Sequence, residues 1–75
     1  MKEILNNIIL NLVDDKNAVK IKQIDNERNT IFEVNVAEKD MGKIIGRQGK
    51  MAKSIRVLMK AFAVREHKKV IVEFI

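Results

Sequence analysis

The chain has 75 residues, a formal net charge of +5 at pH 7, and no cysteine, proline, tryptophan or tyrosine. This length predicts a single domain over residues 1–75, with a thin core and room for one site. The lack of cysteine excludes a disulfide framework and thiolate metal sites, and it suits a cytoplasmic protein. No apolar run reaches the ~18 residues of a membrane span or resembles a signal peptide, so we expect a soluble protein without a membrane partner.

The first segment predicts an amphipathic helix. Its apolar residues recur at the spacing of a single helical stripe, with polar side chains between them. The run Asp14-Asp15-Lys16-Asn17 should end this helix, because such side chains compete for backbone hydrogen bonds. The stripe consists of Ile4, Leu5, Ile8, Ile9, Leu12 and Val13.

Two strands are expected next. Side chains alternate over residues 19–24, and again where Phe32, Val34 and Val36 are separated by polar residues. A polar turn over residues 25–29 lies between them. This pattern is typical of an antiparallel hairpin with one buried face.

All three glycines lie within residues 42–49, which indicates an unusual backbone there. Their spacing fits neither a dinucleotide-binding loop nor a phosphate-binding loop of nucleotide hydrolases. The run Ile44-Ile45-Gly46-Arg47-Gln48-Gly49 places a G-x-x-G turn directly before a helical pattern, where backbone and helix start could meet a sugar-phosphate chain. Because the motif is short, a plain connection between two helices explains it more simply when no context is considered.

The remaining pattern gives the fold class. Apolar residues return to helical spacing over residues 50–66, and residues 70–75 are short and β-branched, as in a final strand. The predicted order is α-β-β-α-α-β, an α+β domain in which helices cover one face of a three-stranded sheet.

The positive charge is concentrated in one segment. Residues 42–69 contain nine Lys or Arg against Glu66 alone, a net of +8. Such asymmetry predicts a polyanionic partner such as nucleic acid. A solvated helix face kept for solubility is the alternative.

Few residues could support catalysis. Ser54 is the only serine, Thr30 the only threonine and His67 the only histidine, and His67 lies in a charged turn. Asp14-Asp15 at a helix end is better explained by solvation than by metal binding. We therefore expect no catalytic residue, no metal site and no cofactor.

The glycine segment, extended through Lys50-Met51-Ala52-Lys53-Ser54-Ile55, resembles the signature V/I-I-G-x-x-G-x-x-I-x-x-I of KH domains, with Ala52 as the one departure. The element order resembles the type II KH arrangement, and the whole chain is similar to small bacterial single-KH proteins of the KhpA type. The resemblance implies an RNA chaperone or post-transcriptional regulator that grips about four nucleotides of single-stranded RNA with low sequence specificity.

In this interpretation Ile44, Ile45 and Ala52 hold bases, while Lys43, Arg47 and Lys50 meet phosphates. The full set of residues expected to bind RNA is Lys43, Ile44, Ile45, Gly46, Arg47, Gln48, Gly49, Lys50, Ala52 and Lys53.

The helix after the glycines has more than one apolar face. Ala52, Ile55, Met59 and Phe62 form the stripe expected to face the sheet, and a second stripe consists of Val57, Leu58, Ala61 and Val64. A second stripe indicates contact with the chain's own first helix or with a partner. The resemblance implies a homodimer, and a heterodimer with a larger KH-containing protein of the KhpB type. The position of the second stripe around the helix predicts that Val57, Leu58 and Ala61 form the dimer interface. A protein-interaction adaptor that does not use its glycine loop for RNA is the alternative function.

Overall fold

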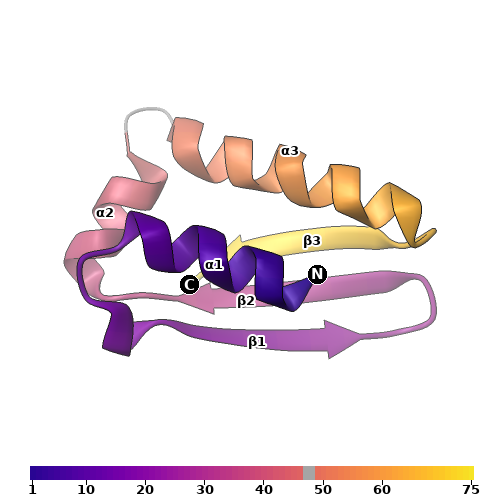
Figure 1. Ribbon diagram of the computed structural model, residues 1–75, viewed down its shortest axis with the longest axis horizontal. Helices are drawn as coiled ribbons and strands as arrows, with labels where there is room; N and C mark the ends of the chain where they lie inside the picture. The colour runs from indigo at the N-terminus through magenta and orange to yellow at the C-terminus, as the bar shows by residue number, and fades with distance from the viewer. Residues whose placement is uncertain (47–48) are drawn as a thin grey trace.

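The computed structural model describes residues 1–46 and 49–75, and in this part of the chain helices cover one face of a small mixed sheet (Figure 1). The predicted α-β-β-α-α-β order and α+β class are confirmed. The elements are α1 (Lys2–Leu12), the short 3-10 helix η1 (Lys16–Ala18), β1 (Lys20–Asp25), β2 (Asn29–Asn35), α2 (Glu38–Ile45), α3 (Lys50–Arg65) and β3 (Lys69–Phe74).

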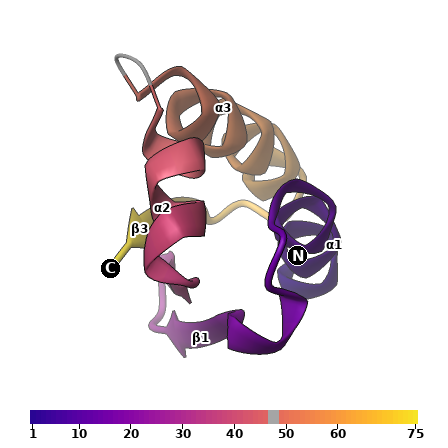
Figure 2. The same ribbon diagram turned by 90° about the vertical axis from the view of Figure 1, so that its left-hand side faces the viewer.

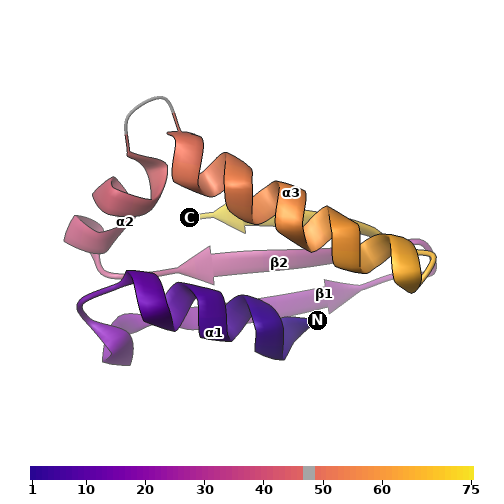
Figure 3. The ribbon, with the colours of Figure 1, turned by 45° about the horizontal axis from the view of Figure 1, so that its top comes forward.

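The sheet has the strand order β1-β2-β3. β1 pairs with β2 in antiparallel orientation, whereas β3 runs parallel to β2. A parallel neighbour requires a crossover connection, and α2 and α3 supply it. Figures 2 and 3 show α1 and α3 lying over the same face of the sheet, with α2 at one end. β3 is therefore an edge strand that lies next to α3.

The core lies between this sheet face and the helices. The stripe of α1 is confirmed, because Leu5 and Ile9 are fully buried. The alternation of β2 is confirmed as well, since Phe32 and Val34 point inward with no exposed surface. The other buried apolar residues are Val13, Val36, Ile44, Ala52, Ile55, Met59, Ala63, Val70 and Val72.

The hairpin turn is shorter than the predicted residues 25–29. β1 continues to Asp25 and β2 already begins at Asn29. The side-chain oxygen of Asn26 accepts hydrogen bonds from the amides of Arg28 (3.2 Å) and Asn29 (2.8 Å), so one asparagine closes the turn.

The inward stripe of α3 also differs at one position. Ala63 is 2% exposed, whereas Phe62 is only partly buried against the core. At about 100° per residue, position 63 lies about 20° from Ala52 around the helix and position 62 about 80° away. Ala63 therefore continues the stripe toward the sheet, and Phe62 covers its flank.

α3 ends in a hydrogen-bonded turn centred on His67. The amide of Lys68 donates to the carbonyl of Ala63 (3.2 Å) and the amide of His67 to that of Val64 (3.2 Å), which is the Schellman pattern. His67 has φ +56°, a left-handed conformation in which glycine is the residue normally found.

Replacing His67 by glycine should therefore stabilise the protein. Relief of the left-handed strain is expected to add about 0.5–1 kcal/mol to the free energy of unfolding, or roughly 2–8 °C in Tm. Thermal unfolding followed by circular dichroism measures the shift. Glu66→Gly is the matched control, because Glu66 has φ −99° and should gain nothing from glycine; equal stabilisation by both variants would contradict the explanation.

Candidate nucleic-acid interface

The two glycines of the G-x-x-G motif both have a positive φ, and Gly49 is in the left-handed helical conformation. Gly46 ends α2 with φ +50° and ψ −161°, and Gly49 precedes α3 with φ +65° and ψ 23°. A Cβ at Gly46 would lie 3.1 Å from the carbonyl oxygen of Lys43, so a larger residue would be strained there. Gly42 lies inside α2, so the unusual backbone expected around the glycines does not extend to it. The predicted contacts of Arg47 and Gln48 lie outside the described residues.

The apolar residues of the predicted site differ in accessibility. Ile44 and Ala52 are 1% and 3% exposed, so their side chains join the core at the junction of α2 and α3. Ile45 is 45% exposed and remains accessible to a ligand. Direct contact of all three with bases stays a prediction.

Lys43 is held by the segment that follows α1. Its ammonium group forms an ion pair with the carboxylate of Asp14. The hydrogen bond from this pair is the main cause that raises the pKa of Lys43. A phosphate would have to compete with Asp14 for this cation.

Asp40 anchors α2 to the same segment. Its side chain is fully buried, and its two oxygens accept hydrogen bonds from the amides of Asp14 (3.1 Å) and Asp15 (3.0 Å). These amides, first that of Asp15 and then that of Asp14, hold the pKa of the Asp40 carboxyl below its ordinary value. Asp40 thus fixes the helix that leads into the glycines.

The stability contributed by Asp40 should depend on pH. A carboxyl whose pKa is lowered by folding stabilises the protein above its ordinary pKa of 3.8, and this contribution is lost as the pH falls through the folded value. Asp40→Asn should therefore lower Tm at pH ~7, and the difference from wild type should shrink toward pH ~2. Thermal melts over this range test it, with the exposed Asp15→Asn as control. A Tm difference that does not change with pH would contradict the role of the charge.

Lys50 and Lys53 lie together on the first turns of α3. With Ser54 and Val57 they line a hollow of about 430 Å³ beside Gly49. Among residues 1–46 and 49–75, no side chain caps this helix start, whose first amides have no partner within the helix. The structure thus brings two predicted phosphate contacts next to the glycine segment.

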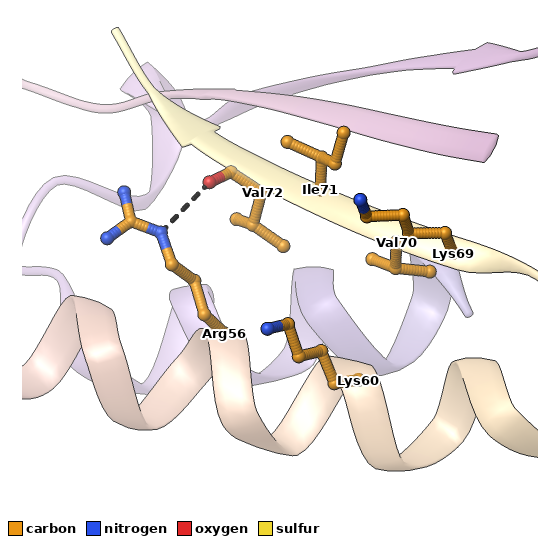
Figure 4. Close-up of a pocket in the computed structure, with 6 residues that line it drawn as sticks. All are labelled: Arg56, Lys60, Lys69, Val70, Ile71 and Val72. Atoms are coloured by element: carbon orange, nitrogen blue, oxygen red, sulfur yellow. Dashed lines mark hydrogen bonds between the residues drawn. The ribbon is translucent and has the colours of Figure 1, made fainter.

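A second pocket lies between α3 and β3, and sequence reasoning did not include it in the site. It measures about 260 Å³ and is lined by Arg56, Lys60, Lys69, Val70, Ile71 and Val72 (Figure 4). The i, i+4 spacing of Arg56 and Lys60 could have indicated a shared helix face. Lys69 could not have been added from local sequence, because it reaches the pocket from a neighbouring strand.

Other kinds of site find little support among residues 1–46 and 49–75. There, no three His, Asp or Glu side chains come together as a group that could hold a metal ion. None of the helices described is both long and apolar enough to cross a membrane.

Comparison with known proteins agrees with this geometry. The family described as KhpA/KhpB, KH domain, matches residues 2–74. A protein from Clostridium acetobutylicum named RNA-binding protein KhpA is 47% identical over 75 residues, the full length of both chains. A protein of the same name from Caldanaerobacter subterraneus subsp. tengcongensis is also 47% identical over both full chains, and one from Borreliella burgdorferi is 40% identical over 97% of this chain and 89% of its own.

No solved structure gives a significant match. The family match spans nearly the whole chain, and the relatives named above are 40–47% identical to it over 97–100% of its residues. The resemblance seen in the glycine signature is thereby confirmed, and the chain belongs to the KhpA/KhpB family of KH-domain proteins.

Proposed function

We propose that this protein binds short single-stranded RNA with low sequence specificity through its G-x-x-G segment and the basic surface beside it. The observation that carries the proposal is the pair of glycines with positive φ, Gly46 at the end of α2 and Gly49 at the start of the basic helix α3. Glycine backbone allows a phosphate to approach closely, and the first amides of α3, at the positive end of the helix dipole, add positive character. The relatives named RNA-binding protein KhpA support the same function.

The surface suits a single strand held by its backbone. Lys50 and Lys53 flank the glycines, and Arg56, Lys60 and Lys69 extend the positive surface along the gap between α3 and β3. An aromatic platform for stacked bases is not needed, because the three phenylalanines pack in or against the core. A KH domain is a binding module, which fits the expectation that the chain has no catalytic role.

We further propose a working role as an RNA chaperone or post-transcriptional regulator in the cytoplasm. A grip on about four nucleotides with few base contacts gives weak, sequence-tolerant binding, as such a role requires. The absence of cysteine agrees with a reducing compartment.

The exposed stripe of α3 supports a protein partner. Val57, Leu58 and Val64 are 64%, 44% and 73% exposed, and Ala61 lies exposed between them. Val57 also lines the hollow beside Lys50 and Lys53, so this apolar stripe adjoins the surface proposed for RNA. We propose that it forms a homodimer, or a heterodimer with a larger KH-containing protein of the KhpB type.

The adaptor function without RNA remains the second candidate, and the same apolar stripe favours it. Binding to a fluorescent, unstructured RNA of about eight nucleotides, compared with a duplex of the same sequence, separates the two functions. Preferential binding of the single strand supports RNA recognition. If neither the single strand nor the duplex binds at low salt, RNA recognition is refuted and the adaptor function is supported.

Affinity for RNA should fall steeply with salt. Each phosphate neutralised on a single strand contributes a slope of about −0.7 to the plot of log affinity against log salt. Two to four contacts from Lys43, Arg47, Lys50 and Lys53 therefore predict a slope of roughly −1.4 to −2.8. Titrations at several salt concentrations measure it; an affinity independent of salt would mean that the basic segment serves solubility alone.

A further inference from the structure

The segment after α1 holds Asp14 in a fixed place beside α2. The amide of Asp14 donates a hydrogen bond to one oxygen of Asp40 at 3.1 Å, and the amide of Asp15 donates to the other oxygen at 3.0 Å. The ammonium group of Lys16 donates to the carbonyl of Leu10 at 2.9 Å, which ties the same segment to the last turn of α1. Figure 3 shows this end of α1 and α2 at the same end of the molecule. Backbone contacts therefore position the carboxylate of Asp14 without using the carboxylate itself.

This carboxylate forms an ion pair with Lys43, which lies in the last turn of α2. Lys43 comes three residues before Gly46, so the two positions are neighbours on the helix surface. The flexible four-carbon stem of lysine allows its ammonium group to reach either Asp14 or an anion beside Gly46. One cation thus lies between an internal carboxylate and the place expected for a phosphate.

We propose that Asp14 is an internal competitor of RNA, whose carboxylate takes the place of one phosphate at Lys43 and so keeps the affinity of the G-x-x-G site low. The inference rests on the proposed binding of single-stranded RNA. Carboxylate and phosphate oxygens are both anionic acceptors, and an ammonium group binds either of them as a point charge. Lys43 must leave Asp14 before it can bind a phosphate, so the free energy of the ion pair opposes RNA binding.

The exposure of the pair sets the size of this effect. The side chains of Lys43 and Asp14 are 53% and 64% exposed, so water and salt screen their attraction. Exposed ion pairs of this kind are weak enough for a phosphate to displace the carboxylate. The competition should therefore lower RNA affinity by about 1.5- to 5-fold without preventing binding. An RNA chaperone must also release its strands, and a carboxylate that recaptures Lys43 favours release.

A purely stabilising role of the pair predicts a different result. Asp40 already binds the same backbone segment through both of its oxygens, so the fold has an anchor that does not depend on the exposed pair. If the pair only stabilised the fold, loss of the Asp14 carboxylate would lower Tm and leave RNA affinity unchanged or weaker. An internal competitor instead gives tighter binding when it is removed.

Asp14→Asn tests the proposal, with Asp15→Asn as the matched control. Both variants remove one negative charge at neighbouring exposed positions, and both keep the backbone amide that binds Asp40. Among residues 1–46 and 49–75, the carboxylate of Asp15 forms no ion pair. In anisotropy titrations with a fluorescent oligouridine of about eight nucleotides, Asp14→Asn should bind about 1.5- to 5-fold more tightly than Asp15→Asn. Equal affinities of the two variants, or weaker binding by Asp14→Asn, would overturn the proposal.

The gain in affinity should depend on Lys43. In a Lys43→Gln background no ammonium group remains for the carboxylate to occupy. Adding Asp14→Asn should then change the affinity no more than adding Asp15→Asn does. A gain that persists in this background would show that Asp14 acts through the overall field of the protein, and it would overturn the role of the ion pair.

Wild-type protein gives a second readout that needs no variant. Titration with the same oligouridine should shift the NMR signal of the Asp14 carboxyl carbon more than that of Asp15, because Lys43 leaves Asp14 for a phosphate. An Asp14 signal that stays unchanged at saturating RNA would contradict the exchange.

Failure of this inference and failure of the proposed function give different results. Wild-type protein that binds oligouridine, with no gain in Asp14→Asn, refutes the competition alone. Wild-type protein that binds no oligouridine at low salt refutes RNA binding itself. Circular dichroism of each variant shows whether a changed affinity reflects unfolding.

Discussion

The double substitution Arg47→Asp and Gln48→Asp should abolish measurable RNA binding. Both positions lie between Gly46 and Gly49 in the sequence, where a phosphate is expected to sit. Loss of one charge-assisted hydrogen bond costs about 1.5–3 kcal/mol, which corresponds to roughly a 10- to 150-fold weaker affinity, and two added carboxylates repel the phosphate further. Filter binding or anisotropy with a short unstructured RNA measures the loss.

A matched control is available on α1. Lys2→Asp with Asn7→Asp introduces the same change of charge at exposed positions away from the glycines. This control should lose affinity only slightly, through the weaker overall field of the protein. Unchanged affinity in the loop variant, with its circular dichroism spectrum preserved, would exclude the G-x-x-G segment as the binding site.

The second large effect concerns self-association. Leu58→Asp should convert a dimer into a folded monomer, because an unpaired carboxylate at a buried symmetric contact is costly. In the isolated chain Leu58 is 44% exposed, so the same carboxylate can reach water and the fold should survive. Sedimentation at tens of micromolar, a range that detects ~micromolar dissociation constants, measures the change in mass.

Ile24→Asp is the matched control for this experiment. Ile24 is 38% exposed, close to the value for Leu58, but it lies on β1 rather than on α3. This variant should remain a dimer. A monomeric wild-type protein, or dissociation by both variants, would remove α3 as the dimer interface.

Local sequence determined the elements of this fold because each has a strong periodic signal. The stripe from Ile4 to Val13 and the alternation from Phe32 to Val36 bury the residues that their periods predict. The glycine pair was equally informative, since both Gly46 and Gly49 have a positive φ, and the combination of φ +50° and ψ −161° at Gly46 is adopted by almost no residue other than glycine. The exact bounds of the hairpin turn were less predictable, because a single side-chain interaction sets them. The hydrogen bond that Asn26 accepts from the amide of Asn29 shortens the turn.

Only the tertiary structure decided how distant residues combine at the surface. The sequence placed Arg56 within a basic segment, but packing of α3 beside the parallel edge strand β3 brings it to the carbonyl of Val72 and joins it with Lys69. Tertiary packing also buries Ile44 and Asp40. Helical spacing alone could not distinguish these two residues from residues at the surface. The sequence by itself thus determined the fold class, the glycine motif and the sign of the partner's charge, because these follow from local periods and composition. The pocket between α3 and β3 depends on a parallel strand pairing between residues about 40 positions apart, and no local pattern encodes that distance.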